Sequence, residues 1–207
     1  MPAGTYEHLG AGGVVRLLER FRCAAGGSGW RYVSELSTPD GRDVGSVDLT
    51  LGVGGLQLRV SVRSGGWSVR GGVSGRELLW VRRPGDTNAA EAREEREQAQ
   101  GFTGVSPAFL VATAALVPRT GEPLRVRLVE LSDVLGARRL DQQWRLTGTD
   151  SHRADLGVVE VSAYERIDLE TAERETVHIA GDVVLAAASI GLAELDSPPG
   201  RALHDLR

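Results

Sequence analysis

Tryptophan side chains are the first candidates for binding chemistry in this chain. A tryptophan joins one N–H donor to a broad apolar ring, which suits a molecule with both apolar and polar parts. The same ring also fills cores and packs across strands, and that structural interpretation stays open. The candidates for lining an aromatic cavity are Trp67, Trp80 and Trp144, together with Phe109.

Arginines are the second candidate group, because the chain contains no lysine and all 24 of its Lys-plus-Arg residues are arginine. A guanidinium group can bind a carboxylate or a phosphate through two parallel hydrogen bonds. Residues 53–83 hold six arginines and only one acid, Glu77. This segment is either a cationic patch for an anionic head group or a solvated strand face balanced by acids elsewhere. Arg70 and Arg145 are the arginines expected to meet a polar head group.

Metal and nucleophile chemistry find little support in the residue pattern. His8 and His204 fall in expected tails and His152 in a turn, so that only His178 falls in an expected strand. The single cysteine, Cys23, allows no internal disulfide and no cysteine-rich metal site. No nucleophile elbow, P-loop or dinucleotide-binding glycine motif is present. We therefore assign no catalytic residue, no metal ligand and no cofactor.

Apolar and polar residues alternate from Gly45 to Arg83 and again through residues 124–187, with paired glycines between the runs of the first block. This pattern is typical of antiparallel strands with one buried and one wet face. We predict a mainly β protein with a single curved antiparallel sheet, a half-barrel or open barrel, of roughly nine to eleven strands. No exact sequence repeat is evident.

Two helices are expected in the middle of the chain. Ser106 and Pro107 provide an N-cap and a first-turn proline, and the apolar run that follows predicts a short buried helix from about 107 to 117. We expect this helix on the concave side of the sheet. Residues 86–100 are rich in helix-forming charged residues and alanine, which predicts an exposed polar helix.

These elements predict one domain with flexible ends. Residues 1–13 are expected to be a flexible N-terminal arm, 14–195 a single β-rich domain with a helical insert at about 87–117, and 196–207 a disordered tail. A net charge of −4 argues against a nucleic-acid partner bound through phosphate neutralisation. No apolar run reaches the roughly 20 residues that span a bilayer, and no secretory signal pattern is seen, so that the expected location is the cytoplasm.

Three segments, 54–72, 104–131 and 164–186, together with the order of elements, resemble the glycolipid-binding family of bacterial cytosolic proteins. That family is similar in fold to the periplasmic lipoprotein carriers. The resemblance implies an antiparallel sheet curled into a half-barrel, with helices on its concave side, and a lipid-like ligand.

The leading functional hypothesis is non-catalytic binding of an amphiphilic or lipid-like small molecule in a cavity lined by the aromatic residues named above. A barrel-type enzyme such as a cyclase or isomerase stays open, because it needs only a shaped apolar cavity and one acid or base. A protein-interaction module with a filled core is the third alternative. The sequence leaves the oligomeric state open.

Overall fold

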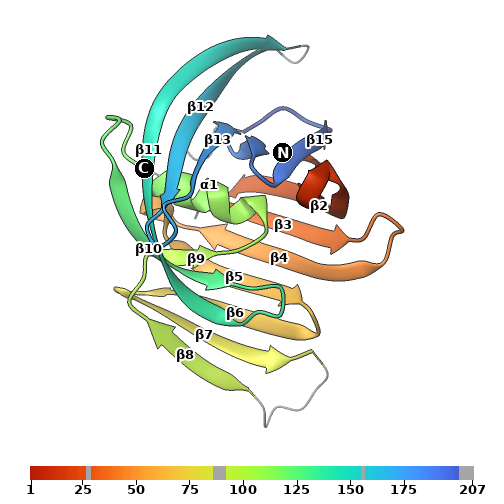
Figure 1. The fold of residues 1–207 in the computed structure, drawn as a ribbon, viewed down its shortest axis with the longest axis vertical. Coiled ribbons are helices and arrows are strands. Elements are labelled where there is room, and N and C mark those ends of the chain that lie inside the picture. The colour runs from red at the N-terminus through yellow and green to blue at the C-terminus, as the bar shows by residue number, and fades with distance from the viewer. Residues whose placement is uncertain (27–28, 86–91, 155–156, 201–207) are drawn as a thin grey trace.

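The chain forms one large open sheet that contains every strand of the described residues, 1–26, 29–85, 92–154 and 157–200 of this computed structural model (Figure 1). Its first block contains β1 (Ala3–Leu9), β2 (Val15–Gly26), β3 (Gly29–Ser37), β4 (Asp43–Leu51), β5 (Gln57–Ser64), β6 (Trp67–Ser74), β7 (Glu77–Pro84) and β8 (Arg93–Glu97). The second block contains β9 (Gly101–Thr103), helix α1 (Pro107–Leu116), β10 (Leu124–Leu131), β11 (Ala137–Ala154), β12 (Gly157–Asp168), β13 (Arg174–Ala180), β14 (Val183–Ala187) and β15 (Ile190–Leu195).

Strand pairing follows the order of the chain, as short turns between strands require. The order across the sheet is β8-β7-β6-β5-β4-β3-β2-β1-β15-β14-β13-β12-β11-β10-β9. Among the described strands, all neighbours pair antiparallel except β9 and β10, which pair parallel. Because β1 pairs with both β2 and β15, the first and last described strands lie side by side in the middle of the sheet. The predicted mainly β class with one open antiparallel sheet is confirmed.

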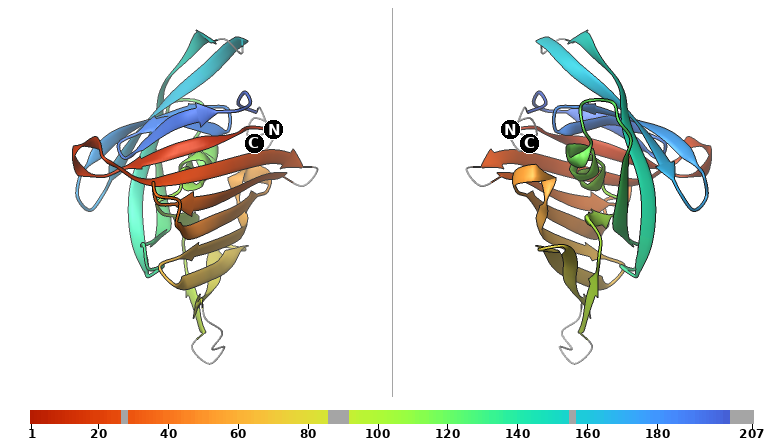
Figure 2. Two further views of the ribbon diagram at one scale, coloured as in Figure 1. Left: turned by 90° about the vertical axis from the view of Figure 1, so that its right-hand side faces the viewer. Right: turned by 90° about the vertical axis from the view of Figure 1, so that its left-hand side faces the viewer.

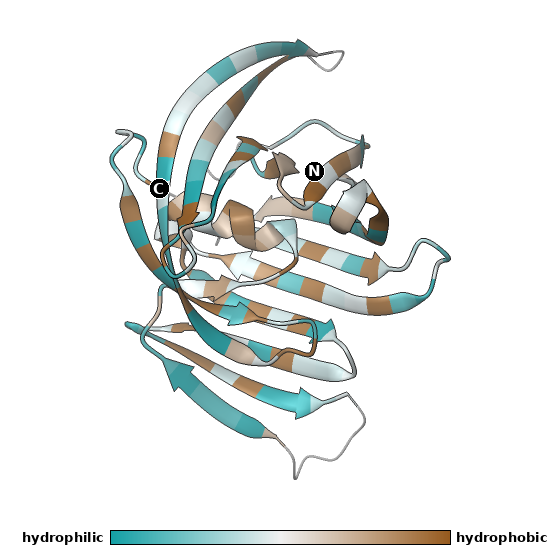
Figure 3. Cartoon of the chain, viewed as in Figure 1, coloured by the Kyte–Doolittle hydropathy of each residue, from teal (hydrophilic) through white to brown (hydrophobic). Residues whose placement is uncertain are grey.

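The prediction of roughly nine to eleven strands was too low, because the described residues form fifteen. The strands that it lacked are β1, β8, β9 and β15. Figure 3 shows the alternation that identified the others, as bands of apolar and polar residues along the strands.

The predicted flexible N-terminal arm is wrong, because residues 3–9 form β1 in the interior of the sheet. Alternate residues of β1 are buried, among them Tyr6 and His8. The Tyr6 hydroxyl accepts a hydrogen bond from the backbone N–H of Val184 at 3.0 Å. The segment therefore belongs to the core of the domain.

The predicted polar helix at 86–100 is also wrong over residues 93–97, which form β8 at one edge of the sheet; residues 86–91 lie outside the described part. Helix propensity is a weak preference, and the free edge of β7 offers backbone partners that override it. The charged residues of β8 suit an edge position, because they discourage further strands from pairing there (Figure 3).

The predicted disordered tail is ordered in its first part. The backbone N–H of Asp196 donates to the carbonyl of Ala3 at 2.8 Å, and the N–H of Gly200 donates to Asp182 Oδ1 at 2.6 Å. Asp182 is 1% exposed and its other oxygen accepts the indole N–H of Trp30 at 2.9 Å. Residues 201–207 lie outside the described part.

Helix α1 begins at the predicted place. Ser106 caps it by accepting a hydrogen bond from the N–H of Ala108, and Pro107 occupies the first turn. All its residues except Leu116 are buried. The helix contacts β9, β14 and the short 3-10 turn η2 (Val53–Gly55), and Figure 2 shows it enclosed between strands of the two blocks.

One turn geometry recurs and was missed in the sequence. The segments 9–13 and 51–55 both read Leu-Gly-x-Gly-Gly and form the 3-10 turns η1 (Ala11–Gly13) and η2. Both have a middle glycine at positive φ, 73° and 70°, and both close with the same pair of backbone hydrogen bonds. Residues 132–136 form the equivalent pair of hydrogen bonds between β10 and β11, with Leu135 at φ 55°. The three turns join pairs of strands in the same way.

Candidate functional site

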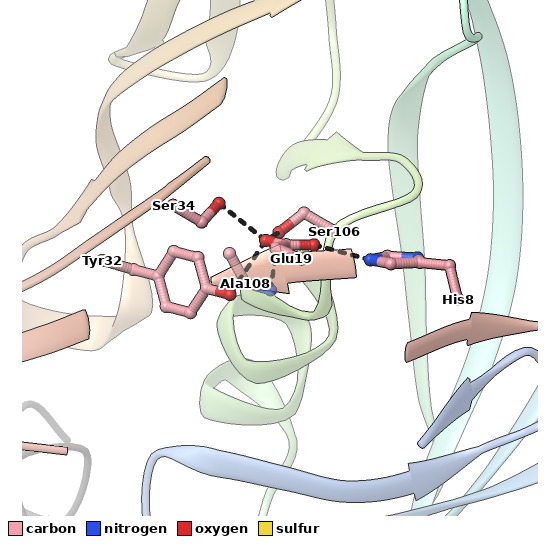
Figure 4. A network of polar contacts seen from close by, with 6 residues as sticks. All are labelled: His8, Glu19, Tyr32, Ser34, Ser106 and Ala108. Atoms are coloured by element: carbon pink, nitrogen blue, oxygen red, sulfur yellow. Dashed lines mark hydrogen bonds and ion pairs between the residues drawn. The ribbon is translucent and has the colours of Figure 1, made fainter. Parts of the chain in front are cut away.

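A fully buried carboxylate lies where β1, β2, β3 and the start of α1 meet (Figure 4). Glu19 Oε1 accepts hydrogen bonds from the hydroxyls of Tyr32 at 2.9 Å, Ser34 at 2.7 Å and Ser106 at 2.5 Å. Its Oε2 lies 2.8 Å from His8 Nε2. An ionised carboxylate offers only acceptors, which suits the three hydroxyl donors and also suits His8 in the tautomer that carries a proton on Nε2.

Two neighbours of Glu19, Tyr32 and Ser106, help to stabilise its hydrogen-bonded carboxylate. Burial, and next the charge of Glu19, raises the pKa of Tyr32 well above the ordinary tyrosine value of 10.0, so that its hydroxyl keeps the proton it donates. Ser106 donates to Glu19 while its oxygen accepts the N–H of Ala108. The carboxylate therefore lies beside the N-terminus of α1, where the helix dipole favours negative charge.

His8 connects this network to a cavity. Its side chain is 8% exposed and lines the cavity described next. The ring nitrogen Nε2 is engaged with Glu19, whereas Nδ1 has no hydrogen-bond partner among the described residues. Nδ1 is also not fully buried. In the described part, the fully buried side-chain atoms without a partner are Trp80 Nε1 and Arg82 Nε, and His8 Nδ1 is not one of them. Of the two ring nitrogens of this cavity-lining residue, Nδ1 is thus the one without a partner in the described part of the chain.

The cavity has a volume of about 570 Å³ and a mainly apolar lining. It is bounded by the ends of β1 to β5 and by the segments 104–106 and 131–135. His8, Ser106 and Phe109 contribute from the network and from α1. Most of the remaining lining side chains are aliphatic, among them Leu9, Leu17, Leu36, Val47, Val62 and Leu131.

Three exposed arginines also line the cavity. Arg63 is paired with Asp43 at 2.9 Å. Arg16 and Arg42 form no ion pair with any described carboxylate, although the charge of Arg42, after the hydrogen bonds from Thr38 and the Asp40 backbone, helps to lower the pKa of Asp40. Among the described residues of the lining, Asp133 is the one carboxylate, so that arginines outnumber carboxylates there.

The turn 132–136 closes one side of the cavity by reaching across to the β5–β6 turn. Ser64 Oγ donates to the carbonyl of Asp133 at 2.8 Å, and Arg82 Nη2 donates to the carbonyl of Val134 at 3.0 Å. Gly65 faces the same turn so closely that a Cβ there would lie 2.7 Å from the Asp133 carbonyl oxygen. These contacts join the two blocks of the sheet at the cavity.

A second hollow of about 920 Å³ shares the segments 104–105 and 131–134 with the first. Its lining is more polar, and several of its charged side chains pair with each other. Arg138 pairs with Glu130 at 2.5 Å, and Arg166 with Glu175 at 2.7 Å. Because the charges of these side chains are already balanced, the second hollow offers a charged ligand fewer free partners than the first cavity does.

The three predicted tryptophans do not line the first cavity. Trp80 is 4% exposed and packs edge-on against Phe102 at 5.6 Å between ring centroids, and Trp144 is 1% exposed. The indole N–H of Trp144 donates to Gln142 at 2.8 Å. Trp67 is half-buried beneath the guanidinium of Arg82, 3.6 Å from the ring centroid. The structure therefore places these rings in packing positions.

Of the predicted site residues, Phe109 lines the cavity and the two arginines lie outside its lining. Arg70 is exposed on β6. Arg145 is exposed on β11 and pairs with Glu165 at 3.3 Å.

Sequence reasoning missed His8 and Glu19. The signal for Glu19 was present, because it shares the alternate positions of Val15, Leu17 and Phe21 and so places a carboxylate on an apolar face. His8 was overlooked because its segment was taken as a loose arm.

Among the described residues, no helix is long and apolar enough to cross a membrane, and no group of three or more His, Cys, Asp and Glu side chains could hold a metal ion. No family model matches the sequence, and no curated protein or solved structure matches it either. The resemblance to the glycolipid-binding family therefore stays a prediction, and the functional argument depends on the site itself.

Proposed function

We propose that this protein binds an anionic amphiphile, a lipid-like small molecule with an apolar body and a carboxylate or phosphate head, in the 570 Å³ cavity. The observation that carries the proposal is a mainly aliphatic lining beside two arginines that have no ion-pair partner in the described part.

The size and lining of the cavity support this ligand class. Small-molecule sites commonly have volumes of about 300–1,000 Å³, with apolar walls and a few polar groups that fix orientation. Aliphatic walls favour an apolar body, because each Å² of apolar surface removed from water contributes about 25 cal/mol. Guanidinium groups at the exposed side select an anionic head.

The fold supports the same interpretation. In this proposal the sheet acts as a half-barrel, α1 covers its concave side, and the turn 132–136 closes the cavity at one end. The resemblance of three segments to the glycolipid-binding family agrees with a lipid-like ligand. The binding residues differ from those predicted, with Phe109 kept and Arg16 and Arg42 taking the place of Arg70 and Arg145.

Displacement of a fluorescent fatty acid from the purified protein tests the proposal. The unlabelled competitors are an anionic long-chain fatty acid and an uncharged long-chain alcohol of the same length. We expect the double variant Arg16→Gln/Arg42→Gln to bind the fatty acid about tenfold more weakly and the alcohol unchanged. Arg153→Gln, an exposed arginine outside the cavity lining, is the matched control and should bind both as the wild type does.

Two results contradict the proposal. One is failure of the wild type to bind either competitor. The other is a double variant that binds the fatty acid and the alcohol equally more weakly, which would show that the arginines do not select the head group. Native mass spectrometry of the purified protein provides a check that needs no variant, because a lipid-sized adduct released on denaturation identifies the ligand class directly.

A further inference from the structure

The His8–Glu19 pair does more than an amphiphile binder requires. Burying an ionised carboxylate is unfavourable unless it is fully hydrogen-bonded, and Glu19 receives four hydrogen bonds at 0% exposure. A cavity that only binds a ligand needs no buried carboxylate behind its wall. The arrangement matches a base held by a second group, in which a carboxylate orients an imidazole whose other nitrogen faces the ligand.

An ionised Glu19 selects one tautomer of the neutral imidazole. Glu19 Oε2 is an acceptor, so that His8 Nε2 carries the proton shared between them. In the neutral ring Nδ1 then has a free lone pair. Because Nδ1 has no partner in the described part and His8 lines the cavity, this lone pair is presented to a bound molecule.

We propose that the cavity is also a proton-transfer site, in which His8 Nδ1 is the base and Glu19 is the positioning residue. This inference rests on the proposed function, because it places the substrate in the same cavity. The substrate class is an apolar β,γ-unsaturated carbonyl compound, in which the C–H bond between the carbonyl and the C=C double bond is acidic. The reaction is an isomerisation within one molecule.

The step balances without a co-reactant. His8 Nδ1 takes the proton from carbon, the C–H electron pair becomes the double bond of an enolate, and negative charge collects on its oxygen. Because the enolate is conjugated with the β,γ double bond, Nδ1–H then returns the proton to the γ-carbon, the C=C double bond moves to the α,β position and the carbonyl is restored. Arg16 and Arg42 line the same cavity and provide positive charge that favours an enolate.

The general-base probe 5-nitrobenzisoxazole tests the inference without knowledge of the natural substrate. A base removes its single ring C–H proton, those electrons complete a nitrile, and the N–O bond breaks to leave a coloured phenolate. The chain contains no lysine, which removes the commonest competing amine base. Among the described residues, the charged side chains that line the cavity with His8 are Arg16, Arg42, Arg63 and Asp133, and Glu19 contacts His8 from behind the wall.

Two variants separate the base from its positioning partner. His8→Gln removes the lone pair and should lower the protein-dependent rate at least about tenfold, to the rate in buffer. Glu19→Gln presents an amide N–H to His8 Nε2, which must then accept, so that the ring proton moves to Nδ1 and the base is lost. We expect the same loss of rate in Glu19→Gln, together with loss of the rise in rate with pH that a general base should give the wild type. The control variants His152→Gln and His178→Gln, both exposed and outside the cavity, should keep the wild-type rate.

Fatty-acid displacement on the same preparations shows whether each variant is folded and still binds. A wild-type rate that persists in His8→Gln overturns the proposal, and loss in His8→Gln with full activity in Glu19→Gln overturns the role of Glu19. If a variant does not fold, the wild type alone decides, because the fatty acid should inhibit the elimination competitively and absence of inhibition overturns the shared site. Fatty-acid binding without any His8-dependent elimination refutes this inference alone, whereas elimination without fatty-acid binding refutes the proposed function alone.

Discussion

Replacing Glu19 with alanine should lower the free energy of unfolding by about 4 kcal/mol. The substitution leaves the hydroxyls of Tyr32 and Ser34 without their acceptor, in residues that are 1% and 5% exposed. A buried polar group left without a partner costs about 1–3 kcal/mol. His8 also loses its partner, but it lines the cavity and is 6% exposed, so that water can replace the carboxylate and the cost there is smaller.

Glu19→Gln is the matched control, because its carbonyl can still accept from the three hydroxyls and its amide can donate to His8. It should cost about 1–2 kcal/mol, the difference between hydrogen bonds to charged and to neutral acceptors. Equilibrium unfolding in guanidinium chloride, followed by tryptophan fluorescence, measures both. The reasoning is refuted if Glu19→Ala costs less than about 1 kcal/mol, or if the glutamine variant is destabilised as much as the alanine variant.

Three further outcomes are expected elsewhere in the fold. Gln57→Leu should cost about 2–3 kcal/mol and speed hydrogen exchange at Phe102, because the Gln57 amide bonds both the N–H and the carbonyl of Phe102 at 2.7 and 2.9 Å; unchanged exchange would contradict this. Ala172→Gly should raise the free energy of unfolding by about 0.5–1 kcal/mol in chemical denaturation, since this exposed alanine has φ 60° and glycine removes the left-handed strain. Burial raises the pKa of Tyr6 and Tyr32 well above 10.0 in the folded protein, so that the unfolded chain ionises first and stability falls as the pH rises above 10.0. Phenolate absorbance from these tyrosines before the unfolding transition would argue against it.

The sheet was predictable where side chains alternate over a whole strand, as in β4 and β5, because one face of each strand is buried. The alternation fails for β1, whose buried positions include a glycine and a histidine. It also fails for β8, where pairing with β7 decides the structure and the residues themselves favour a helix. Neither strand can be recognised without its neighbours.

The sequence could not show whether the tryptophans line a cavity, because a tryptophan has the same sequence pattern in a cavity wall as in a packed core. Trp80 and Trp144 fall on the buried faces of their strands in either case, and only packing distinguishes the two. The structure places the cavity at strand ends instead, where small and aliphatic residues from five strands meet the turn 132–136. Such a meeting depends on how the two blocks of the sheet approach each other.

The buried carboxylate of Glu19 shows how much of a site the local sequence pattern can predict. Alternation alone places Glu19 on an apolar face, and a charge in that position requires hydrogen-bonding partners. The partners come from β1, β3 and the cap of α1, and Ser106 lies 87 residues from Glu19 along the chain. Strand order could bring His8 and Ser34 beside β2, but the approach of the α1 cap depends on the long connection through β8 and β9. The sequence can therefore reveal that a polar network must exist at Glu19, and the fold is needed to show that the network opens onto a cavity through His8.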